Sequence, residues 1–131
     1  MPETQNIPVS RHAIIVMAPE ETPEGRGRIL HAFATARDLA AAGADVEIYF
    51  DGIGVTCLTA FHARDNRFTE NYGPLFDAIR PLIAGACDFC THRRFDATAG
   101  AAAFGIATAG GIDEHHSLAS LLLDGRHVHT F

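Results

Sequence analysis

The chain has 131 residues, 47% of them hydrophobic and 20% charged, which is typical of a single globular domain spanning residues 1–131. A formal net charge of −6 argues against nucleic acid or an anionic membrane as the main partner, and no apolar run approaches the roughly 20 residues of a membrane-spanning helix. The polar N-terminal residues lack the pattern of a signal peptide, and three cysteines are too few for a disulfide framework. We therefore expect a cytoplasmic protein with free thiols.

The first third of the chain is typical of a β-α-β unit. Residues 12–18 form a near-continuous apolar run, which predicts a central parallel strand buried on both faces. Apolar residues at helical spacing predict a helix over 25–42, and Gly43 is well placed to end it. Residues 46–50 then predict the second strand, which ends at Asp51.

The middle of the chain predicts two further helices and a third strand. We expect a short helix over 53–61, a polar loop over 62–70 and a helix over 72–83, in which Pro81 disturbs the last turn. The third strand is expected over 85–89, with a turn or helix beginning near Cys90.

The last third is rich in small residues, which makes its elements harder to define. We expect a fourth strand over 104–108, a helix that Asp113 caps and Gly125 ends, and a final strand over 126–131. The sum predicts a three-layer α/β sandwich. It has a mainly parallel sheet of about five strands, helices on both faces, and chemistry at the carboxyl ends of the strands.

Cys87 is the most informative residue of the sequence. It follows a small, apolar run and precedes polar, basic residues, which predicts a position at the tip of a buried strand and the start of a helix. Helical N–H groups and the nearby Arg93 and Arg94 would favour a negative charge there, and the thiolate is the reactive form of cysteine. The alternative is a small buried hydrophobic residue.

The other two cysteines differ in what they indicate. Cys90 completes a C-x-x-C pair, so it could resolve a persulfide by forming a disulfide with Cys87, or face the core as a structural residue. Cys57 lies in an apolar stretch and is expected to be a core thiol.

The eight histidines raise the question of a metal site. Cys87, Cys90 and His92, with His115 or His116, could supply four zinc ligands. However, a second C-x-x-C or an H-x-x-x-H at fitting distance is missing, so we expect no bound metal or cofactor. His127 and His129 alternate on one strand face and are expected at the surface or in an interface.

The order and spacing of these pieces resemble one known family. The matching segments are 13–16, 38–44, 46–55, 118–122 and 127–131. Together they resemble the DsrE/DsrF-like family of small sulfur-relay proteins, which includes the TusD and YchN types. The resemblance implies that Cys87 takes the place of the cysteine that accepts a sulfane sulfur as a persulfide, and that Arg93 and Arg94 match the basic pair after it. It also implies sulfur donor and acceptor proteins as partners and assembly as a trimer or hexamer. Cys90 and the longer stretch 95–111 depart from the TusD pattern.

These observations predict a cytoplasmic sulfur carrier, or persulfide sulfurtransferase, that uses Cys87 as its sulfur acceptor. A carrier should have an accessible Cys87 close to an arginine. The alternatives are a non-catalytic oligomeric subunit with structural cysteines, and a metal-binding module built from cysteines and histidines.

Overall fold

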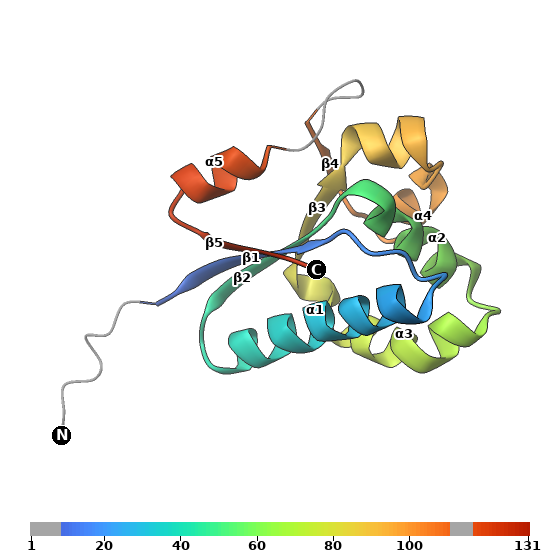
Figure 1. Cartoon of the computed structure of the whole chain (residues 1–131), viewed down its shortest axis with the longest axis horizontal. Coiled ribbons are helices and arrows are strands. Elements are labelled where there is room, and N and C mark those ends of the chain that lie inside the picture. Colours follow the sequence, from blue (N-terminus) through green and yellow to red (C-terminus); the bar gives the residue numbers. More distant parts are fainter. Residues whose placement is uncertain (1–8, 111–116) are drawn as a thin grey trace.

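A computed structural model describes residues 9–110 and 117–131. Within them, five strands form one sheet in the order β4-β3-β2-β1-β5, and all neighbouring strands are parallel (Figure 1). The strands are β1 (Arg11–Val16), β2 (Asp45–Phe50), β3 (Ile83–Cys87), β4 (Thr108–Ala109) and β5 (His127–Thr130). The helices are α1 (Pro23–Ala41), α2 (Thr56–Ala63), α3 (Arg67–Ile79), α4 (Thr98–Ala103) and α5 (Leu118–Leu123), with short helical turns η2 (Gly52–Val55), η3 (Arg80–Leu82) and η4 (Cys90–Arg94). The predicted α/β sandwich with a parallel sheet is confirmed.

The two faces of the sheet are covered unequally. Alternate residues of β1 point to opposite faces: Ile14 and Val16 join the large core beneath α1, α2, α3 and α4, whereas Ala13 and Ile15 pack with Leu121 of α5. Figure 1 shows α5 on the opposite side of the sheet from α1 and α3. Among the described residues, no helix is both long and apolar enough to cross a membrane.

Helix α1 begins two residues before the predicted helix over 25–42, and Gly43 follows its cap residue Ala42 in the left-handed conformation. Thr22 caps it by accepting the Gly25 N–H at 3.0 Å, and Pro23 occupies the first turn, where its missing N–H costs nothing. The buried side of the helix includes Phe33, whose ring makes an edge contact with the ring of Phe50. This packing fixes α1 across β1 and β2.

The loop predicted over 62–70 is wrong in its second half, because α3 begins at Arg67. Asn66 caps this helix by accepting the Thr69 N–H at 2.8 Å, so the polar residues form a helix start instead of a loop. At the other end, Pro81 stands in the 3-10 turn η3 and α3 stops at Ile79, since proline has no N–H to continue an α-helix. Strand β3 consequently begins two residues before the predicted strand.

The fourth strand also differs from the prediction. It is only Thr108–Ala109, and the alanine-rich segment before it forms α4, which the sequence analysis missed. Gly100 lets α4 pack closely on α2, because a Cβ there would lie 2.6 Å from the carbonyl oxygen of Leu58. The predicted cap Asp113 lies outside the described residues; Ser117 caps α5 by accepting the Ser120 N–H.

Candidate functional site

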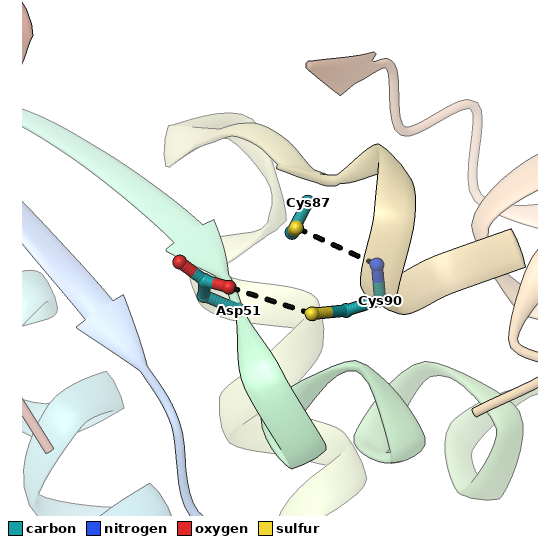
Figure 2. Close-up of side chains that lie close together, drawn as sticks. All are labelled: Asp51, Cys87 and Cys90. Atoms are coloured by element: carbon teal, nitrogen blue, oxygen red, sulfur yellow. Dashed lines mark hydrogen bonds between the residues drawn. The ribbon is translucent and has the colours of Figure 1, made fainter. Parts of the chain in front are cut away.

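Asp51, Cys87 and Cys90 meet at the carboxyl edge of the sheet. Each offers one ligand-type atom, and these three atoms lie within 4.8 Å of one another. Figure 2 shows the two thiols and the carboxylate turned toward each other, with Asp51 after β2, Cys87 at the end of β3 and Cys90 on the helical turn that follows.

The sheet explains why Asp51 reaches this edge. Strands β2 and β3 are parallel neighbours, with Phe50 in register with Ala86, so the residues that follow them lie at the same end. Asp51 then caps η2, its Oδ1 accepting the Gly52 N–H at 2.7 Å. The absence of a side chain at Gly54 lets η2 lie close to β1. A Cβ at this position would stand 2.0 Å from the carbonyl oxygen of Val16.

Cys87 occupies the predicted position between strand and helix. A helical turn starts at Asp88, and the Cys90 N–H donates to Cys87 Sγ at an N···S distance of 3.5 Å. This is the contact of a helix cap, with sulfur in place of the usual oxygen. The contact places a backbone N–H donor at the Cys87 sulfur.

Cys90 differs from Cys87 in that its thiol contacts a carboxylate. Its thiol donates to Asp51 Oδ1 at 3.7 Å. Burial, the hydrogen bond and charge of Cys87, and the charge of Asp51 together raise the pKa of Cys90 from 9.0 to about 11, against the opposing effect of a backbone hydrogen bond from Gly52. Cys90 is therefore a protonated thiol at neutral pH. A backbone N–H therefore reaches each sulfur, and the difference between them is that the Cys90 thiol donates to the Asp51 carboxylate.

The burial of Cys87 contradicts the expectation that a carrier has an accessible sulfur at this residue. Both Cys87 and Cys90 are 0% exposed, and Asp51 is 6% exposed. The residue types of a C-x-x-C motif do not reveal what covers the sulfurs. Cys90 begins η4, a π-helical turn in which the Phe95 N–H bonds the carbonyl oxygen of Cys90 at 3.0 Å.

The two predicted arginines lie on the same turn but reach outward. Arg93 and Arg94 are both exposed, and the guanidinium carbon of Arg94 lies 4.8 Å from the centre of the Phe95 ring. A role for either arginine in steering an anionic sulfur donor stays a prediction.

The structure keeps two of the predicted zinc ligands, Cys87 and Cys90, together but does not place His92 beside them. Both ring nitrogens of His92 are engaged, one 3.0 Å from Asp88 Oδ1 and the other 2.6 Å from Thr98 Oγ1. Asp51 takes the place beside the two thiols that was predicted for His92. The other predicted ligands, His115 and His116, lie outside the described residues.

Cys57 is a core thiol, as predicted. Its side chain is fully buried, its Sγ donates to the carbonyl oxygen of Ala18 at 3.9 Å, and burial raises the pKa of the thiol. It belongs to the same large core as Cys87 and Cys90 but lies outside the three-residue cluster.

Asp51 is the site residue that the sequence analysis missed. The available signal was an acidic residue directly after a buried strand, at the edge where the cysteine was expected. Using that signal requires knowing that β2 and β3 are neighbours.

Comparisons of the chain with protein-family models, with curated proteins and with solved structures find no match. The resemblance to the DsrE/DsrF-like family therefore stays a hypothesis.

Proposed function

We propose that the chain is a sulfur carrier in which Cys87 accepts a sulfane sulfur as a persulfide, with Cys90 as the second thiol and Asp51 as its proton acceptor. The observation that carries the proposal is that the two thiols lie together with a carboxylate: Cys87 Sγ accepts the Cys90 N–H, and the Cys90 thiol donates to Asp51. A nucleophilic thiolate beside a second, protonated thiol suits transfer followed by release.

The loading step conserves oxidation state. The Cys87 thiolate attacks the outer sulfur of a donor hydropersulfide, R–S–S–H; the donor S–S bond breaks, R–S⁻ leaves, and Cys87 carries the S–S–H group. An acceptor thiolate then attacks the outer sulfur, and Cys87 leaves as a thiolate. No external oxidant or reductant is needed.

Cys90 supplies a second exit. Its proton passes to the Asp51 carboxylate, its sulfur attacks Cys87 Sγ, and hydrosulfide leaves as the Cys87–Cys90 disulfide forms. In this step the outer sulfur is reduced by one electron as it leaves as hydrosulfide and Cys90 Sγ is oxidised by one, whereas Cys87 Sγ, which has one S–S bond before and after, is unchanged. A reducing dithiol must then restore the pair before another cycle.

Burial has two consequences for this chemistry. It shields a persulfide from thiols in solution. It also requires the residues that bury Cys87 to move before a donor can reach its sulfur. The π-helical turn η4 supports such a role, since π-helical turns are rare and frequently occur at functional sites. The predicted donor and acceptor proteins, and assembly as a trimer or hexamer, belong to the same proposal.

The second candidate is a subunit in which the cysteines are structural. It is favoured by the 0% exposure of both thiols. Free cysteine often serves as a small core hydrophobe, and in that case sulfur transfer would not depend on Cys87.

The test is intact-protein mass spectrometry after incubation with a low-molecular-weight hydropersulfide. We expect the wild type and Cys57→Ser, the control with an unrelated buried thiol, to gain one sulfur, about 32 Da. We expect Cys87→Ser to gain none. Cys90→Ser should keep the adduct longer than the wild type, because its hydrosulfide exit is closed. No adduct on folded Cys90→Ser, or an equal adduct on Cys87→Ser, would support the structural candidate instead.

A further inference from the structure

Three histidines gather where strands β1 and β5 pair. The parallel register sets His12 opposite His127 and Ile14 opposite His129, so the three imidazoles project from the same face of the sheet. The ring centres of His127 and His129 lie 5.3 Å and 5.2 Å from that of His12.

The ring nitrogens of two of these residues face each other. His12 Nδ1 lies 2.9 Å from His129 Nε2, and the other nitrogen of His12, Nε2, lies 3.0 Å from Ser10 Oγ. When His12 Nε2–H donates to Ser10, the lone pair of Nδ1 points toward His129. Metal-binding histidines are held in the same way, with one nitrogen on the ion and the other on a hydrogen-bond partner.

We propose that His12, His127 and His129 form a binding site for a divalent transition-metal ion that prefers imidazole ligands, such as Zn²⁺. Two nitrogens that bind one tetrahedral Zn²⁺ at about 2.0–2.1 Å stand about 3.3 Å apart, so the hydrogen-bonded pair, 2.9 Å apart, has to open by roughly 0.4 Å and give up its shared proton to hold the ion. His127 is the exposed one of the three histidines and lies two residues before His129 on β5. A change of its side-chain rotamer can turn the ring toward the ion.

Burial, followed by the charges of His129, His127 and Arg126, lowers the pKa of His12. The charge of Arg126 is itself balanced by ion pairs with Asp45 and Glu47.

This site is separate from the thiol site. His12 is the second residue of β1, near the amino edge of the parallel sheet, whereas Cys87 ends β3 at the carboxyl edge. Metal binding here would therefore be an activity independent of the proposed sulfur carriage, and the two can be tested separately.

The experiment is a titration of the reduced, full-length chain with Zn²⁺. Calorimetry measures the binding, and NMR of the histidine ring nitrogens shows which imidazoles bind the ion. We expect Zn²⁺ to shift the signals of His12 Nδ1 and His129 Nε2. His127→Gln and His129→Gln should each weaken this binding roughly tenfold or more, as expected for loss of a ligand. Any Zn²⁺ bound by the thiols would form a separate step that neither substitution changes.

Two control variants separate this site from other histidines. His31→Gln removes an exposed imidazole on α1, and the double variant His115→Gln/His116→Gln removes the adjacent pair outside the described residues; both should bind as the wild type does. His127 is exposed, so His127→Gln tests the site even if His129→Gln weakens the fold. Absence of histidine shifts with Zn²⁺, or binding unchanged in both strand variants, would overturn the proposal.

Discussion

The raised pKa of Cys90 predicts that alkaline pH destabilises the fold. The pKa is about 11 in the folded chain, against an ordinary value of 9.0. The unfolded chain therefore loses this proton first as the pH rises, so the stability that Cys90 contributes is complete below about pH 9 and falls as the pH approaches 11. One pKa unit corresponds to about 1.4 kcal/mol, which gives a full loss of roughly 3 kcal/mol and about 2 kcal/mol by pH 10.5.

The assay is urea unfolding of the wild type and of Cys90→Ala from neutral pH to about pH 10.5. Cys57 and Tyr49 also have raised pKa values, but both residues are present in both chains, so their contribution cancels in the difference. Cys90→Ala should change the free energy of unfolding at neutral pH. As the pH rises further, the free energy of unfolding of this variant should fall less steeply than that of the wild type. Val55→Ala, which removes buried carbon and no titrating group, should run parallel to the wild type.

Equal alkaline slopes for the wild type and Cys90→Ala would refute this reasoning. They would mean that Cys90 ionises as readily in the folded chain as in the unfolded one, and that its contacts with Asp51 and Cys87 do not hold it as a thiol.

Two further predictions concern packing and charge. Gly54→Ala should cost about 3 kcal/mol in urea unfolding, because the added methyl would stand 2.0 Å from the carbonyl oxygen of Val16, whereas Gly27→Ala meets no atom within 4 Å and should gain about 1 kcal/mol of helix propensity. Equal stabilities would contradict the close approach at Gly54. Arg126→Ala should cost about 2–3 kcal/mol in the same assay, since this buried cation pairs with two half-buried carboxylates, and Arg28→Ala, which breaks an exposed pair, should change stability by less than about 0.5 kcal/mol. A small, similar loss in both arginine variants would show that burial adds little to the pairs of Arg126.

The strands of the central sheet could be predicted because their burial is written in consecutive apolar residues. Residues 12–18 and 46–50 contain most of β1 and most of β2. The position of Cys87 followed from the same pattern, since the apolar run stops there and a polar segment begins.

The elements that depend on distant contacts could not be predicted in this way. The alanines and glycines of α4 carry no amphipathic pattern, and the helix is held by the close approach of Gly100 to α2. The polar residues before α3 also looked like a loop because a helix cap and a turn use the same residue types.

The composition of the thiol site shows the same limit. Cys87 and Cys90 are neighbours in sequence, so their pairing was visible, but Asp51 joins them only through the order of β2 and β3 in the sheet. The burial of both sulfurs likewise depends on segments that fold over them from elsewhere in the chain.

The most direct test of sulfur carriage at Cys87 is to locate the bound sulfur. The folded Cys90→Ser chain, in which the hydrosulfide exit is closed, is incubated with a hydropersulfide, alkylated, digested and sequenced by tandem mass spectrometry. We predict that the extra sulfur is found on the peptide at Cys87 and not at Cys57. Sulfur at Cys57, or none at Cys87 in a chain that remains folded, would contradict the proposal.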